Sequence, residues 1–150
     1  MLHSVDIKGW EKNTAWCVPT CISFLTGCPL IHAQSRAAFF QNKALKDVEG
    51  VYVSEAILML YEQGYKVEQI KLLDQYDEAP TLKAFLENRT PYQKCMPLLI
   101  IIEDKNKFSH AITAHYDYVA DNHTMKPVPV LKFPHLKKYV TNAWIVSKKR

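Results

Sequence analysis

The first half of the chain carries apolar residues at helical spacing. Residues 16–26 are mostly apolar, and this pattern predicts a short helix that is buried on most of its surface. Gly27 is expected to end that helix. A second helix is expected over residues 33–45, and a third from Ser54 as its N-cap to Gly64 as its C-cap. The first half is therefore predicted to be helical.

The second half changes to the patterns of β-strands. Short runs of β-branched and aromatic residues are separated by polar turns, and one further helix is expected over residues 81–88. The predicted strands cover residues 65–73, 96–103, 108–118, 119–120, 128–132 and 139–147. Helices first and strands afterwards predict an α+β fold, in which the N-terminal helices pack on an antiparallel β-sheet.

Length and composition are those of an ordinary globular domain. The 150 residues are 48% hydrophobic and 23% charged, which excludes disorder and repeat arrays and predicts one domain over residues 1–150. The longest apolar run, residues 96–102, is far below the roughly 20 residues that a membrane helix needs, and the first residues form no apolar signal segment. We therefore expect a soluble, cytoplasmic protein with no membrane partner, whose four cysteines are reduced.

Positive charge is concentrated at the C-terminal end. The net charge is +4, yet residues 122–150 hold seven basic and no acidic side chains. Such a segment can bind an acidic partner or nucleic acid. Its lysines alternate with apolar residues, as in strands with a solvated face, and neither a stacking motif nor a recognition helix accompanies them. This pattern argues against a nucleic-acid site and keeps an acidic partner as a hypothesis.

Cys17 is the candidate nucleophile of this sequence. It stands at the amino end of the first predicted helix, where unpaired N–H groups and the helix dipole stabilise an anion and so favour the thiolate. A thiol nucleophile needs a proton carrier, and His110 begins a strand after a polar loop, where it can project toward a helix end. Asp121 or its neighbour Asn122 returns beside the imidazole after strand, turn and strand. These residues are the parts that acyl transfer by a thiol requires.

Two other interpretations of the cysteines stay open. A cysteine on an apolar helix is more often a core residue than a nucleophile, and we expect Cys21, Cys28 and Cys95 to be core residues. Cys17, Cys21, Cys28 and His32 have the spacing C-x3-C-x6-C-x3-H and could surround a zinc ion. That spacing matches none of the compact zinc-finger patterns.

The remaining histidines give no catalytic signal. Solvated or structural roles are expected for His3, His32, His115, His123 and His135. The chain contains neither a Gly-rich phosphate loop nor a His-Glu-x-x-His helix, so no cofactor is expected.

Several segments resemble papain-like cysteine peptidases, and they do so in one order along most of the chain. Residues 16–27 resemble the nucleophile helix of small papain-like peptidases. Residues 53–67 resemble the following helix and strand of bacteriocin-processing peptidases and of phage-encoded papain-like proteins. Later segments are similar to the helix and strand before the catalytic histidine and to the histidine block itself: 81–86, 97–102, 109–114, 119–122 and 140–146.

The resemblance implies a papain-like fold and a cysteine peptidase or isopeptidase that acts on a peptide or protein substrate. It assigns Cys17 as nucleophile, His110 as general base and acid, and Asp121 as the residue that orients the imidazole, with Asn122 as the competing third member. If the protein is phage-encoded, its location would be the virion or the host cytoplasm.

One position departs from the papain-like pattern. These enzymes usually have a Gln six residues before the nucleophile as part of the oxyanion hole, and this chain has Glu11, an acceptor unsuited to stabilising an oxyanion. Asn13 is expected to donate instead. Glu11 motivates an alternative function, a non-catalytic papain-like protein that binds a partner or belongs to a virion. A zinc-binding protein is the second alternative.

Overall fold

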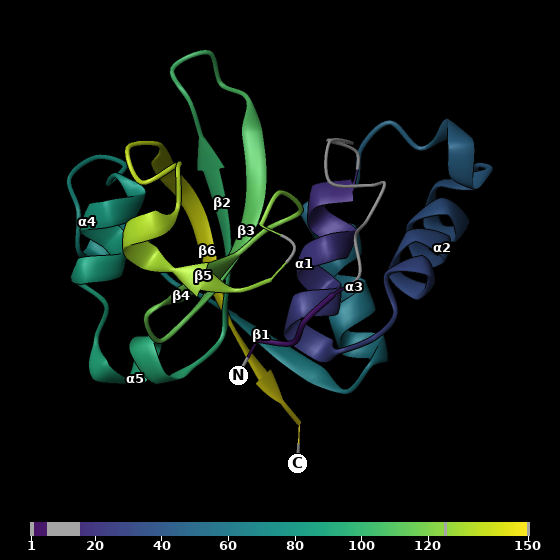
Figure 1. The fold of residues 1–150 in the computed structure, drawn as a ribbon, viewed down its shortest axis with the longest axis horizontal. Coiled ribbons are helices and arrows are strands. Elements are labelled where there is room, and N and C mark those ends of the chain that lie inside the picture. The colour runs from purple at the N-terminus through teal and green to yellow at the C-terminus, as the bar shows by residue number, and fades with distance from the viewer. Residues whose placement is uncertain (1, 6–15, 125, 150) are drawn as a thin grey trace.

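The computed structural model describes residues 2–5, 16–124 and 126–149, which form a layered arrangement of helices and strands (Figure 1). The α-helices are α1 Cys17–Thr26, α2 Leu30–Gln41, α3 Val53–Glu62, α4 Leu82–Glu87 and α5 Pro91–Cys95. Short 3-10 helices are η2 Leu45–Asp47, η3 Leu72–Asp74 and η4 Val130–Lys132. The strands are β1 Tyr65–Gln69, β2 Leu98–Glu103, β3 Ser109–His115, β4 Tyr118–Ala120, β5 Val128–Pro129 and β6 Tyr139–Lys148. The predicted α+β class is confirmed.

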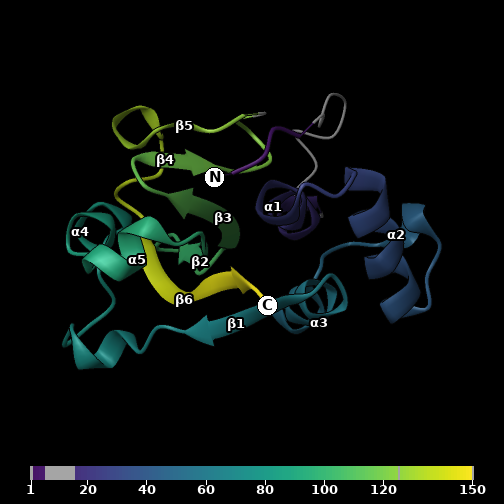
Figure 2. The same ribbon diagram turned by 90° about the horizontal axis from the view of Figure 1, so that it is seen from below.

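The strands form one antiparallel sheet with the order β1-β6-β2-β3-β4-β5. The four strands from β2 to β5 follow one another as a meander, whereas β6 returns to lie between β1 and β2. Figures 1 and 2 show α1, α2 and α3 on one side of this sheet and α4 on the other. The helices of the first half therefore pack on an antiparallel sheet, as predicted.

The central strand β2 is buried on both faces of the sheet. Leu99 and Ile101 join the apolar cluster beneath α1, α2 and α3, while Leu98, Ile100 and Ile102 join a second cluster with α4. Because side chains alternate between the two faces of a strand, a strand covered on both sides must be apolar throughout. This explains the unbroken apolar run that marks β2 in the sequence.

Helix α1 is the buried helix that its composition predicts. Every residue from Val18 to Leu25 is buried, and the helix contacts α2, α3 and β3. It ends at Gly27, which has a φ of 79° and donates its N–H to the carbonyl of Ser23 at 2.8 Å. A side chain at Gly27 would also meet the ring of His3 at 3.0 Å, so glycine is required there on both conformational and steric grounds.

The second helix lies earlier in the chain than expected. Instead of spanning residues 33–45, α2 runs from Leu30 to Gln41. Pro29 has its φ fixed near the helical value and suits the position before the first turn. Asn42 adopts the left-handed conformation with a φ of 52°, which ends the helix.

The third helix begins two residues before the predicted start. Its N-cap is Tyr52 and not Ser54, because the Glu55 carboxylate accepts the backbone N–H of Tyr52 at 3.0 Å. A glutamate at the third helical position commonly stabilises a helix start in this way. The C-cap is Gln63, followed by Gly64 with a φ of 85°.

Two strand predictions and one missed helix need correction. The strand expected over residues 65–73 stops at Gln69 and is followed by η3. The strand expected over residues 128–132 is only β5, after which η4 begins, because Pro129 has no N–H to continue the pairing. Helix α5 was not predicted, although Thr90 and Gln93 form a reciprocal capping box around Pro91.

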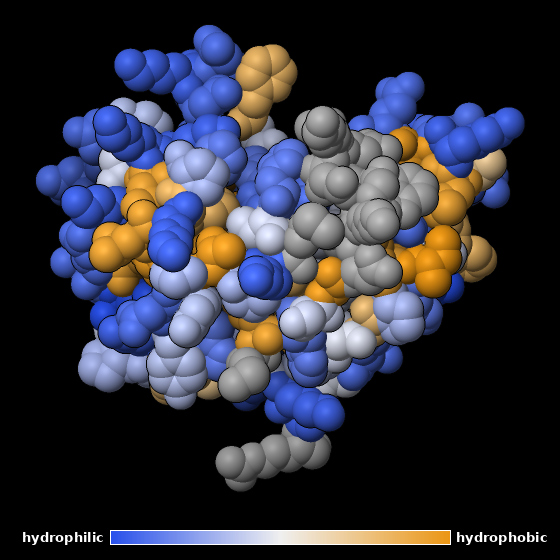
Figure 3. Space-filling model, viewed as in Figure 1, coloured by the Kyte–Doolittle hydropathy of each residue, from blue (hydrophilic) through white to orange (hydrophobic). Residues whose placement is uncertain are grey.

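Apolar side chains reach the surface at several places on the face seen in Figure 3, among them over α2 and over the η4 segment. Phe39 of α2 is 69% exposed and Leu131 of η4 is 85% exposed. Among the described residues, no helix combines the length and the apolar character needed to cross a bilayer.

Candidate active site

Three elements bring Cys17, His110 and Asp121 together. Cys17 is the first residue of α1, His110 is the second residue of β3, and Asp121 directly follows β4. Helix α1 packs on β3, and Cys17 and His110 line one cleft. The start of a buried helix therefore faces the start of a strand, and the neighbouring strand delivers the carboxylate.

The carboxylate of Asp121 is fixed by three hydrogen bonds. Its Oδ2 lies 2.7 Å from Nε2 of His110, and its Oδ1 accepts the backbone N–H groups of His123 at 2.9 Å and Thr124 at 3.0 Å. The Asp121 side chain is only 1% exposed. The group that bonds to the imidazole is thus the Asp121 carboxylate, the first of the two alternatives considered from the sequence; Asn122 is also buried.

The orientation of the imidazole follows from this bond. Because Nε2 of His110 faces Asp121, Nδ1 is the ring nitrogen that remains for the thiol of Cys17. A carboxylate accepts but does not donate, so the pairing makes Nε2 the protonated nitrogen of a neutral His110. Nδ1 is then the basic nitrogen that can take a proton from Cys17.

Charges around His110 favour its protonated form. Burial disfavours the imidazolium, but the hydrogen bonds to Asp121 and Cys17 and the charges of both outweigh burial and raise the pKa of His110 from 6.5 to about 9. Burial likewise opposes ionisation of Asp121, yet the hydrogen bond and charge of His110 hold the pKa of Asp121 below its usual value. At neutral pH the pair is therefore imidazolium and carboxylate.

No protein-family model matches this sequence, and no curated protein matches it either. The function of this chain is therefore inferred from the chemistry of the site. That chemistry is a thiol, an imidazole and a buried carboxylate arranged in series.

The cleft beside Cys17 is built from both halves of the chain. It has a volume of about 440 Å³ and is lined by the start of α1, by residues 51–53, by the adjoining ends of β2 and β3, and by residues 141–144 of β6. Besides the Cys17 thiol, the imidazole of His110 and the carboxylate of Glu103, the last residue of β2, line this cleft. Most of the remaining lining is apolar, as is common in clefts that bind a ligand.

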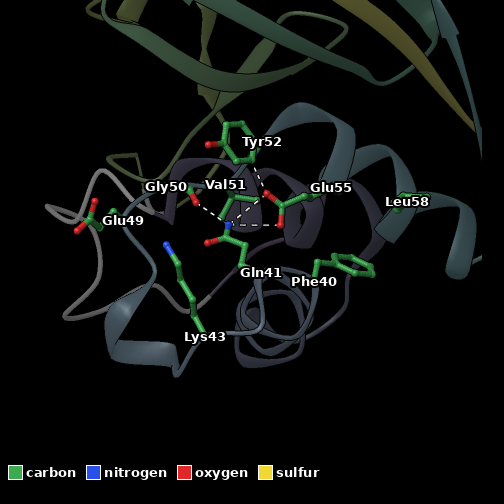
Figure 4. Close-up of a pocket in the computed structure, with 9 residues that line it drawn as sticks. All are labelled: Phe40, Gln41, Lys43, Glu49, Gly50, Val51, Tyr52, Glu55 and Leu58. Atoms are coloured by element: carbon green, nitrogen blue, oxygen red, sulfur yellow. Dashed lines mark hydrogen bonds between the residues drawn. The ribbon is translucent and has the colours of Figure 1, made fainter.

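A second hollow adjoins this cleft, and Figure 4 shows its lining residues. It has a volume of about 830 Å³ and shares Val51 and Tyr52 with the cleft beside Cys17. Gln41 holds this shared segment, since its Nε2 donates to the carbonyl of Gly50 at 2.8 Å and to the Glu55 carboxylate at 3.1 and 3.3 Å. One wall of the cleft beside Cys17 is therefore anchored to α2 and α3.

The other three thiols lie in different environments from that of Cys17. Cys21 is fully buried, and burial, with the charges of Cys17 and Asp121, raises its pKa well above the ordinary value. Cys28 is half-buried, so it borders the core. Cys95 is exposed, and its thiol donates to the carbonyl of Tyr92 at 3.2 Å. The prediction that Cys95 is a core residue is wrong, because it ends the unpredicted helix α5.

The zinc alternative finds no support in the geometry. In the part of the chain that the structure describes, no three His, Cys, Asp or Glu side chains converge on a position for a metal ion. Cys17, Cys21, Cys28 and His32 all belong to that part, so the set C-x3-C-x6-C-x3-H is not assembled. Glu11 and Asn13, the two residues discussed for the oxyanion hole, lie outside the described residues.

Two histidines beside the site were not recognised from the sequence. The ring of His123 lies 5.5 Å from that of His110, and the ring of His135 lies 5.9 Å from it, centroid to centroid. His123 had a usable signal, since continuing the β3–β4 register beyond Thr113 and Ala120 sets it opposite His110. His135 had none, because it follows a proline-rich segment far along the chain.

Proposed function

We propose that the protein is a thiol-dependent hydrolase, a cysteine peptidase or isopeptidase with Cys17 as nucleophile. The observation that carries this proposal is the 2.7 Å bond between His110 and the buried Asp121 carboxylate, on an imidazole that shares its cleft with Cys17 at a helix start. A thiol, an imidazole and an orienting carboxylate in this order are the working parts of cysteine acyl transfer.

The reaction uses each residue in turn. Nδ1 of His110 takes the proton of Cys17 before the substrate reacts, which forms the imidazolium beside a thiolate, and the thiolate then attacks the carbonyl carbon of the substrate. Asp121 holds the ring and stabilises the imidazolium. The C–N bond then breaks as His110 returns its proton to the leaving amine, which leaves an acyl group on Cys17. Water, deprotonated by His110, hydrolyses that thioester and restores the free thiol.

The site supports a papain-like enzyme acting on a peptide or protein. In support, a core helix that starts with the nucleophile packs on an antiparallel sheet whose strand supplies the histidine. The cleft continues past Val51 and Tyr52 into the second hollow, which gives room for residues beside the scissile bond. The carboxyl side of that bond would be held at Cys17 and the leaving amine at His110.

Competitive alkylation tests this function without a known substrate. Cys95 is exposed and Cys17 is half-buried, so exposure alone predicts faster labelling of Cys95 by iodoacetamide. If Cys17 is activated, it reacts first, and the contrast is largest at about pH 6, where an ordinary thiol is protonated. Peptide mapping by mass spectrometry after brief labelling identifies the modified residue.

The matched variant is His110→Ala. It should slow the labelling of Cys17 and leave the labelling of Cys95 unchanged, because Cys95 lies in α5, away from the site. If Cys95 reacts before Cys17 in the wild-type protein, or if Cys17 reacts equally fast without His110, the proposed nucleophile is wrong.

A further inference from the structure

The ring of His135 is inserted between the catalytic imidazole and the core. It meets His110 at a centroid distance of 5.9 Å and an angle of 73°, and it meets Phe133 at 5.4 Å and 83°. Both are edge-to-face arrangements, which aromatic pairs prefer. Phe133 is 3% exposed and belongs to the cluster beneath α4. His135 thus connects a fixed core residue to His110.

His123 contacts His110 differently. Its ring is 5.5 Å away and tilted at 35°, but the residue is exposed. Its backbone N–H, and not its side chain, bonds to Asp121. Of the two rings beside His110, that of His135 therefore packs on a buried side chain, Phe133.

We propose that His135 is a positioning residue, whose neutral ring holds the His110 imidazole and keeps water from its bond to Asp121. This inference rests on the proposed function, because it assigns His135 a role toward the catalytic histidine. A neutral ring edge or face beside an imidazolium is favourable, whereas a second cation at that position is repelled by His110.

The surroundings of His135 keep it neutral. The charged or titratable groups that act on it are His110 on β3, Asp121 and His123 after β4, and Lys138 before β6. Burial, Lys138, His110 and His123 lower the pKa of His135, and Asp121 opposes them. At neutral pH His135 is therefore an uncharged aromatic ring beside a charged one.

This arrangement makes the support sensitive to acid. When His135 gains a proton, its charge faces the His110 imidazolium and the two rings repel each other. A phenylalanine at this position would fill the same place without that response. With histidine at position 135, the site therefore loses its geometry in acid, when His135 becomes protonated.

The test compares His135→Ala, His135→Phe and the control His123→Ala, using p-nitrophenyl acetate as an acyl probe from about pH 5 to pH 10. His135→Ala should lower kcat about 10- to 100-fold with a smaller change in KM, since a misplaced catalytic group costs this much. Its basic limb should also move to lower pH, because water that reaches the His110–Asp121 bond weakens that bond and screens the Asp121 charge, and this loss outweighs the relief of burial. His135→Phe should restore kcat at neutral pH and retain more activity than wild type at about pH 5. His123→Ala should stay within about twofold of wild type.

A second measurement separates this inference from the proposed function. NMR titration of the His110 ring reports its pKa whether or not the protein hydrolyses the probe. A pKa that falls in His135→Ala and recovers in His135→Phe supports the positioning role even if the wild type lacks hydrolytic activity. An unchanged pKa and pH profile in folded His135→Ala, verified by circular dichroism, would overturn it, as would a His135→Phe protein as impaired as His135→Ala.

Discussion

The two ends of strand β3 carry the same side chain in opposite states. His110, at the start of the strand, bonds to a buried carboxylate, and its pKa rises to about 9. His115, at the end, places Nε2 2.9 Å from the carbonyl of Cys95, and burial lowers its pKa. Both rings are largely buried. The charge of the partner, more than burial, therefore decides which imidazole becomes a cation.

The two thiols of helix α1 also differ in their surroundings. Cys17 lies at the helix start beside His110, whereas Cys21, one turn later, is enclosed in the core. Burial and the nearby negative charges hold Cys21 in its neutral form. Two members of one residue type thus lie in different surroundings within one element, and the following variants test whether they differ in reactivity.

Replacing the two β3 histidines should give the largest difference. His110→Ala should reduce hydrolysis of an activated acyl probe by up to about 10⁶-fold, as the loss of a general base does in a catalytic triad. His115→Ala should leave kcat unchanged for the folded protein and lower stability by about 1 kcal/mol through one lost hydrogen bond. Steady-state kinetics and urea unfolding measure the two effects. A catalytic defect in folded His115→Ala would abolish the contrast between the ends of β3.

Removing the negative charge beside His110 should have the next largest effect. Asp121→Asn should lower kcat by about 10⁴-fold and return the pKa of His110 toward 6.5, since the Asp121 bond is a main cause of its rise. The control is Asp117→Asn, which removes an exposed carboxylate that pairs with Lys94 at 3.3 Å and acts on Arg89. NMR titration of His110 measures the shift. A His110 pKa that stays near 9 in Asp121→Asn would show that another group sets it.

Features that are determined by neighbouring residues in the sequence could be predicted. The apolar run of β2 and the buried residues of α1 report burial directly, so both elements could be predicted. The pairing of His110 with Asp121 follows from a short hairpin and was also accessible. The capping box of Thr90 and Gln93 was present but unrecognised, which hid α5 and the exposure of Cys95.

Long-range packing accounts for what the sequence did not reveal. The contact of His135 with His110 depends on how the segment after β5 folds back over the sheet. The prolines at positions 127, 129 and 134 leave the sequence around β5 without periodicity. The wall at Val51 likewise depends on Gln41 bonding across to Glu55. Such contacts join residues far apart in the chain, and the sequence around each residue does not indicate its partner.

Titration of His110 should contribute to the pH dependence of the free energy of unfolding. Because its pKa is higher in the folded protein, its contribution is fully present below pH 6.5 and is lost as pH rises through about 9. The loss is at most on the order of 3 kcal/mol. Cys21, whose pKa is also raised, acts in the same direction at high pH, so the His110 part is the difference in slope between wild type and His110→Ala in urea unfolding. Equal slopes would contradict the raised pKa.

The smallest effect is expected on the far face of the sheet, where a substitution should change only the free energy of unfolding. Thr81 caps α4 by accepting the N–H of Ala84 at 3.1 Å, so Thr81→Ala should lower the free energy of unfolding by about 1 kcal/mol. The control Lys83→Ala removes only an exposed 3.9 Å pair with Glu87 and should change stability by less than about 0.5 kcal/mol. Neither variant should alter kcat or the pKa of His110, because α4 packs on the second apolar cluster and contributes no group to the cleft. A change in either quantity in Thr81→Ala would mean that this cluster transmits strain to His110, with Phe133 and His135 as the connecting rings.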